Sequence, residues 1–153
     1  MPDFFNILSN SVLIVALAAC FSAQFLKFLG GIFIKGKFDI HNLFGAGGMP
    51  SSHAAFVTAM AAGVGATIGW DSPEFAIAFV VAAIVMYDAS GVRQEAGKHA
   101  KAINRIIDEV SVGTSEWTES RFKELLGHTS AEVFVGAVWG VTVFGVSKFV
   151  ASM

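Results

Sequence analysis

Charged residues are scarce in this chain of 153 residues. Asp, Glu, Lys and Arg make up 14% of it, against about 25% in an average soluble domain. A surface so poor in charge cannot cover a water-facing globule, whereas a hydrophobic content of 54% suits contact with lipid. The single cysteine, Cys20, excludes an intrachain disulfide and is expected to be a small buried hydrophobe. The net charge of −2 provides no basic excess, so nucleic acid is excluded as a partner.

Long apolar stretches predict an all-α integral membrane bundle that forms a single domain over residues 1–153. A helix needs about 20 apolar residues to cross the hydrocarbon core, and about four such spans are expected. They lie near residues 7–34, 54–70, 74–90 and 131–150. The third continues helically toward Ile107, so a polar helix and loop separate it from the fourth. No basic segment precedes the first span, which we interpret as a retained helix, with a cleaved signal peptide as the alternative.

Lysine and arginine cluster in two connections, one after the first span and one after the third. The connection between the second and third spans holds only acidic charges. Because positively charged loops stay in the cytoplasm, both basic connections should be cytoplasmic and both termini outside. The host membrane is a bacterial inner membrane or an organellar membrane. The basic residues are Lys35, Lys37, Arg93, Lys98, Lys101, Arg105, Arg121 and Lys123.

A glycine-rich stretch, GGMPSSH at residues 47–53, precedes the second span. We expect a helix to begin here, with Pro50 in an early helical position. Ser51 either caps this helix or donates a hydrogen bond to a ligand. The unpaired N–H groups of a helix start favour an anion, and Gly48 lets the backbone pack close to it. The simpler interpretation is a capped helix with His53 at the lipid interface.

A second histidine occurs at the predicted start of the last span, in LGHTSAE at residues 126–132. His128 and Glu132 are four residues apart and are expected on one helix face. A carboxylate beside an imidazole fixes its tautomer and leaves the other nitrogen free to attack or to accept a proton. An ordinary interfacial pair is the alternative. No metal site is expected, because a tetrahedral zinc site needs more His or Cys ligands than can be grouped here.

Three further charged residues flank these motifs. Arg93, at the end of the third span, is suited to bidentate contact with phosphate. Asp88 is expected to pair with Arg93 or with a lysine. Lys27 lies inside the first span and either contributes to the site or extends to the interface. Two helix starts, two histidines and these cations on one basic face predict a phosphate site between membrane helices.

The order of these motifs resembles the type 2 phosphatidate phosphatase and vanadium-haloperoxidase superfamily. PSSH at residues 50–53 is similar to its Pro-Ser-Gly-His motif, and HTSAE at residues 128–132 to the end of its Ser-Arg-x5-His-x3-Asp motif. The strings GGMPSSH and YDASGVR, at residues 47–53 and 87–93, resemble a small divergent branch. The chain departs from the superfamily at Ser52, which replaces glycine, and at Arg121, which lies one residue further from His128. No Lys-x6-Arg-Pro motif precedes the first histidine motif.

The resemblance implies a membrane phosphatase that needs no cofactor and hydrolyses a lipid-linked phosphate monoester or pyrophosphate. It implies that His128 is the nucleophile that forms a phosphohistidine, with Glu132 orienting it and His53 acting as general acid. Asp88 would support the phosphate-binding residues. These phosphate-binding residues are Ser51, Ser52, Gly48, Arg93, Lys27 and Lys123.

Other functions stay open beside this one. The incomplete cation motif favours a non-catalytic binder or translocator of phosphorylated lipid. A vanadate-dependent haloperoxidase uses similar residues, and a scaffolding membrane protein would need only the helix caps. Gly65-x-x-x-Gly69 and Gly136-x-x-x-Gly140 would suit close helix packing, within the chain or in a homodimer.

Overall fold

The computed structural model describes residues 4–35, 48–110, 122 and 127–153, and the structural statements below concern these residues. Every regular element among them is helical, which confirms the all-α prediction. In chain order they are η1 (Phe4–Ser9), α1 (Ser11–Lys35), α3 (Ser52–Ile68), α4 (Pro73–Tyr87), η2 (Asp88–Val92), α5 (Arg93–Val110) and α6 (Ser130–Ala151).

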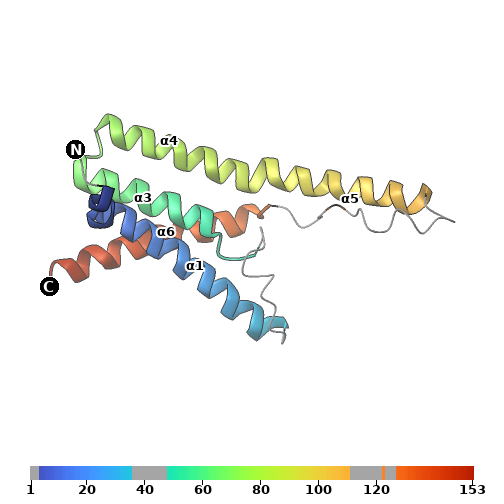
Figure 1. Cartoon of the computed structure of the whole chain (residues 1–153), viewed down its shortest axis with the longest axis horizontal. Coiled ribbons are helices and arrows are strands. Elements are labelled where there is room, and N and C mark those ends of the chain that lie inside the picture. The colour runs from blue at the N-terminus through green and yellow to red at the C-terminus, as the bar shows by residue number, and fades with distance from the viewer. Residues whose placement is uncertain (1–3, 36–47, 111–121, 123–126) are drawn as a thin grey trace.

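Three segments are long and apolar enough to cross a membrane, namely Ser11–Ile32, Pro73–Glu109 and Ser130–Ala151. The fourth apolar helix, α3, is shorter, with 17 residues. It is the central helix of the bundle, because α1, α4 and α6 all pack against it (Figure 1). Its buried residues are mostly alanine and glycine, which let the neighbouring helices approach closely.

Polar side chains determine where the helices begin. The Asn10 side chain accepts the Leu13 N–H at 3.0 Å, so α1 begins at Ser11 and the prediction of a span from residue 7 was wrong. Ser72 caps α4 and Pro73 is its first residue, the position at which a helix tolerates proline. Pro50, in contrast, precedes the cap of α3 and is not part of the helix, which corrects its predicted position.

The four apolar helices run up and down, so α3 and α6 both begin at the end of the bundle where α1 and α4 finish (Figure 1). Both chain ends lie at the opposite end of the bundle (Figure 1). The two histidine motifs therefore meet at one end, which we call the histidine end.

Glycine brings α6 against α3. A Cβ atom at Gly136 would clash with the Ser51 carbonyl, and one at Gly140 with the carbonyl of Ala55. Close packing through Gly136-x-x-x-Gly140 is thus confirmed. Gly65 instead faces the ring of Trp70 just beyond its own helix, so Gly65-x-x-x-Gly69 is not a helix–helix contact motif within the described chain.

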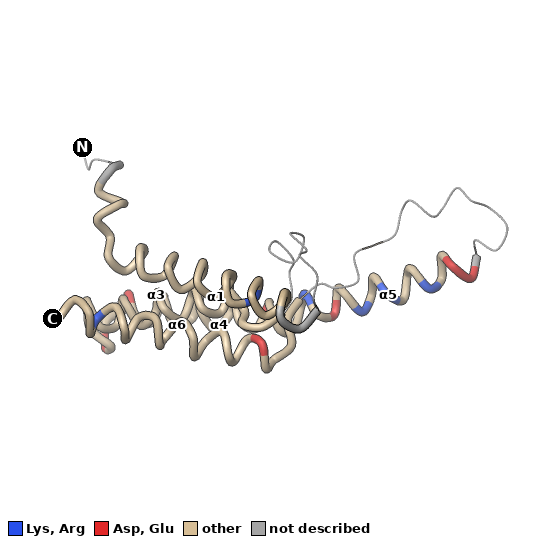
Figure 2. The backbone as a smooth tube through the Cα atoms, turned by 90° about the horizontal axis from the view of Figure 1, so that it is seen from below, with Lys and Arg blue, Asp and Glu red and all other residues tan. Residues whose placement is uncertain are grey.

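Helices α4 and α5 form one continuous rod through η2, as predicted, and α5 extends out of the bundle (Figure 1). Half of the charged residues of the described chain lie along α5 (Figure 2). The bundle itself is nearly free of charge, so the few charges at its histidine end stand out.

Candidate functional site

The two predicted histidines lie together at the histidine end. The ring centroids of His53 and His128 are 6.1 Å apart, in an edge-to-face arrangement with an interplanar angle of 65°. His53 is the second residue of α3, and His128 lies two residues before α6. Only 3% of His128 is exposed. The structure therefore brings together two histidines that are 75 positions apart in the sequence.

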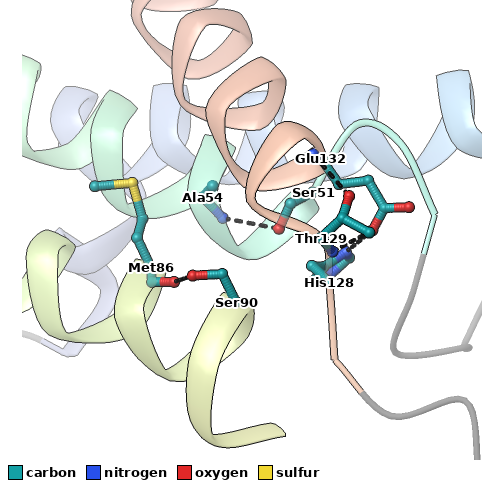
Figure 3. A network of polar contacts seen from close by, with 7 residues as sticks. All are labelled: Ser51, Ala54, Met86, Ser90, His128, Thr129 and Glu132. Atoms are coloured by element: carbon teal, nitrogen blue, oxygen red, sulfur yellow. Dashed lines mark hydrogen bonds and ion pairs between the residues drawn. The ribbon is translucent and has the colours of Figure 1, made fainter. Parts of the chain in front are cut away.

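Backbone contacts fix the start of α3 against the start of α6. The Ser51 N–H donates to the Glu132 carbonyl at 3.1 Å. The Ser51 hydroxyl oxygen accepts the Ala54 N–H at 3.4 Å and caps α3 (Figure 3). Ser51 is fully buried. Of its two predicted roles, the cap is the one observed, and a hydrogen bond from Ser51 to phosphate stays a prediction.

His128 is paired with Glu132 through one carboxylate oxygen. The His128 Nδ1 atom lies 3.2 Å from Glu132 Oε2, and the same oxygen accepts the Thr129 N–H at 3.0 Å (Figure 3). The Thr129 hydroxyl in turn accepts the Glu132 N–H at 3.3 Å, which completes a capping box.

The contact thus has a different origin from the one predicted. His128 precedes the helix and does not share a helix face with Glu132; the capping box folds the carboxylate back toward the histidine. Thr129 was missed in the sequence, although the spacing Thr-x-x-Glu was a signal for it.

The environment of His128 favours its neutral form. Burial lowers the pKa of His128 below its ordinary value. The hydrogen bond and the charge of Glu132 act in the opposite direction, as does a hydrogen bond that the ring donates to the backbone of Gly48. The Glu132 carboxylate accepts a hydrogen bond from the Nδ1–H group. In the neutral ring the proton is then on Nδ1 and the lone pair is on Nε2.

Lys27 reaches the site from α1. It is only 9% exposed, and its charge acts on His53, His128 and Glu132. A Cβ atom at Gly48 would lie 3.0 Å from Lys27 Cδ, and the φ angle of Gly48 is +94°. Glycine at position 48 therefore leaves room for the lysine side chain and tolerates the left-handed backbone there.

Arg93 is held at the rim of the site by Asp88. Its Nε atom lies 2.7 Å from Asp88 Oδ2, with both side chains partly exposed. This confirms the predicted pairing. Both charges act on His53, so the arginine is close enough to influence the site while remaining accessible to water.

A π turn, η2, connects this rim to His128. The Arg93 N–H donates to the carbonyl of Asp88, five residues earlier, and the Ala89 carbonyl accepts the His128 N–H at 2.8 Å. Gly127, with φ of +89°, packs directly on the backbone of Arg93 and Gln94. No side-chain pattern in the sequence indicates this backbone register.

For two of the predicted phosphate-binding residues, Lys123 and Ser52, the described part of the structure shows no contact that bears on phosphate binding. Lys123 lies outside the described residues. Ser52 is half-buried at the first position of α3. In the part of the chain that the structure describes, no group of three or more His, Cys, Asp or Glu residues could hold a metal ion.

The fold and the site define a helical membrane protein with paired histidines at one end of its bundle. Residues 8–143 match the model of the Divergent PAP2 family, and the chain belongs to this family. It is 37% identical over 146 residues to the "Uncharacterized membrane protein YuiD" of Bacillus subtilis (strain 168). The alignment covers 89% of this chain and 92% of that protein. No solved structure matches the chain. The family match confirms the resemblance that the two motifs indicate.

Proposed function

We propose that this protein is a membrane phosphatase that hydrolyses a lipid-linked phosphate monoester or pyrophosphate through a phosphohistidine. The observation that carries the proposal is the pair of histidine rings 6.1 Å apart, one of them held by a carboxylate at Nδ1. Membership of a family described as divergent PAP2 supports the same reaction class.

In the first step, His128 Nε2 attacks phosphorus, a nitrogen–phosphorus bond forms and the bond to the leaving oxygen breaks. His53, protonated beforehand, gives its proton to the departing alkoxide or phosphate oxygen. In the second step, water attacks the phosphohistidine while His53 takes its proton, and phosphate leaves. Free His128 is restored, with Glu132 stabilising the positive charge that its ring carries in between.

Charge on the phosphoryl oxygens needs cations at fixed positions. Lys27, buried beside both histidines, and Arg93, at the rim, supply two in this proposal. The N–H groups at the start of α3 add a partial positive charge. No metal ion or cofactor takes part. We expect the histidine end to face the cytoplasm and both termini to lie outside.

A second candidate function is a binder or translocator of phosphorylated lipid that lacks catalysis. Two observations favour it. Arg93 is already engaged by Asp88, and the Ser51 hydroxyl caps a helix and is fully buried. Both groups would be partly occupied before any phosphate arrives.

Phosphate release distinguishes the two candidates. The detergent-purified protein is incubated with a panel of lipid phosphates in the presence of EDTA, beside His128→Ala. His99→Ala is the matched control, since His99 is exposed on α5 away from the bundle. We expect release by the wild type and by His99→Ala, and none by His128→Ala. Equal release by His128→Ala would refute the nucleophile. No release by the wild type, with orthovanadate still raising its Tm, would favour the binder.

A further inference from the structure

The π turn η2 connects several parts of the candidate site. It follows the membrane helix α4, begins at Asp88, is followed directly by Arg93, and contacts the segment that holds His128. Such turns are rare and often occur at functional sites. We propose that η2 is the positioning element of the site: its shifted register binds the His128 backbone and brings Arg93 beside Asp88. What is positioned, a nucleophile and a phosphate-binding cation, rests on the proposed function.

The backbone part of the argument concerns the Ala89 carbonyl. In a regular α-helix this carbonyl would accept the N–H of Arg93, four residues later. Here that N–H donates to Asp88 instead, and the Ala89 carbonyl accepts the His128 N–H at 2.8 Å. Ala89 is buried and packs with Ala54 and Val133, so this hydrogen bond is sheltered from water. The extra residue of the π turn is thus what orients a carbonyl toward His128.

The side-chain part concerns the pair of Asp88 and Arg93. In an α-helix, residues five apart point about 140° away from each other, since each residue turns the chain by about 100°. Their side chains could not then meet directly. In η2 the same residues are joined by the i to i+5 backbone bond, and their side chains form an ion pair at 2.7 Å. The turn therefore sets the direction of the arginine.

One residue within the turn, Ser90, and one that packs against it, Gly127, suit this register. The Ser90 hydroxyl donates to the Met86 carbonyl at 2.9 Å, which adds a partner for a carbonyl at the start of the turn (Figure 3). Gly127 packs so closely on η2 that a Cβ atom there would lie 2.8 Å from the Arg93 carbonyl carbon. Only glycine lets the segment before His128 approach the turn to hydrogen-bonding distance.

The test removes the extra residue. Deletion of Ser90 converts the five-residue turn to a regular helical one, and deletion of Ala102 is the matched control. Ala102 lies in the same rod, on the exposed part of α5, and its loss leaves η2 intact. Two readouts are used: the imidazole nitrogen shifts of His128 in protein labelled with ¹⁵N-histidine, assigned with His128→Asn, and the affinity for orthovanadate.

We expect the wild type and the Ala102 deletion to show His128 protonated on Nδ1 when neutral. In the Ser90 deletion Asp88 and Arg93 are four residues apart and can still pair, but the Ala89 carbonyl is taken up by the regular helix and His128 loses its backbone partner. This deletion should therefore show mixed tautomers and bind orthovanadate about tenfold more weakly, the change expected when the displaced His128 loses one charge-assisted contact to the anion. A folded Ser90 deletion with the wild-type tautomer and wild-type affinity would overturn the proposal.

A second variant covers a Ser90 deletion that fails to fold. Gly127→Ala keeps the turn but forces the His128 segment away from it, and should give the same mixed tautomers. Wild-type nitrogen shifts in Gly127→Ala would overturn the proposal as well. Neither readout depends on turnover, so a wild type without phosphatase activity would contradict the proposed function and leave this comparison intact.

Discussion

Replacing Glu132 with glutamine would separate the charge of this side chain from its hydrogen bonding. One oxygen, Oε2, serves both the Thr129 N–H at 3.0 Å and His128 Nδ1 at 3.2 Å. The glutamine amide oxygen can occupy the same position, so the capping box is retained. Only the charge is lost. Glu132→Ala would remove the cap too and should cost about 1 kcal/mol more in the free energy of unfolding.

The effect on catalysis follows from the weaker hydrogen bond. A hydrogen bond to a charged group contributes about 1.5–3 kcal/mol and a neutral one about 0.5–1.5 kcal/mol. The loss of about 1–1.5 kcal/mol corresponds to a fall of about tenfold in kcat/KM. Glu132→Gln should therefore lose most of its phosphatase activity while keeping a Tm closer to that of the wild type than Glu132→Ala does.

The pH profile gives the sign of the effect. The nucleophile must be neutral, so kcat/KM falls in acid as His128 becomes protonated. The charge of Glu132 raises the pKa of His128 against the lowering effect of burial, with Lys27 and His53 as the other charged neighbours. Removing the charge lowers the pKa of His128 further, and the acid limb should move to lower pH.

Two measurements check this: kcat/KM against pH on a lipid phosphate, and an NMR titration of the His128 ring. The second gives the His128 pKa even in a protein without turnover. An acid limb and a ring titration that stay unchanged or move to higher pH would refute the argument that Glu132 acts on His128 through its charge.

Three further predictions concern the other elements of the site. His53→Ala should lower kcat for the hydrolysis of alkyl phosphates, whose leaving groups need a proton, far more than for aryl phosphates. An equal fall in kcat for both classes would contradict the role of His53 as general acid. Lys27→Met should fold, because methionine suits a buried apolar position, and should weaken orthovanadate binding about tenfold by calorimetry; unchanged affinity would exclude Lys27 from the phosphate site. Gly136→Ala should destabilise the protein by about 1–3 kcal/mol through the clash with Ser51, while Gly145→Ala, where no atom lies within 4 Å, should not; equal Tm values for the two variants in detergent would contradict the packing of α6 on α3.

Much of the fold could be predicted from the sequence, because the helices and their order across the membrane depend on the pattern of hydrophobic and charged side chains. Hydrophobic runs predicted the apolar helices, and their alternating direction predicted that His53 and His128 open helices at the same end. The pairing of Arg93 with Asp88 followed from their charges. The pairing of His128 with Glu132 was predicted too, although the capping box and not a shared helix face produces it.

What could not be predicted depends on the backbone. The Ala89 carbonyl binds His128 through a π turn, and alanine carries no chemical signal for such a register. The start of α1 was misplaced for another reason. The apolar Ile7 and Leu8 continue the hydrophobic run, but Asn10 caps the helix after them. Thr129, in contrast, could have been predicted, because the spacing Thr-x-x-Glu is a capping-box signal.

The short central helix has a consequence for the lipid around the protein. With 17 residues, α3 spans about 26 Å, less than the roughly 30 Å of a typical hydrocarbon core. Helix α1, with 25 residues, is longer than that core. A bilayer that fits α1 is too thick for α3, so a site at the start of α3 would lie below the level of the surrounding headgroups. The headgroup of a phosphorylated lipid would have to move deeper into the bilayer, or the leaflet would have to thin locally, before the lipid phosphate reached the histidines. Bilayer thickness would then control access to the site, and short-chain lipids should favour it.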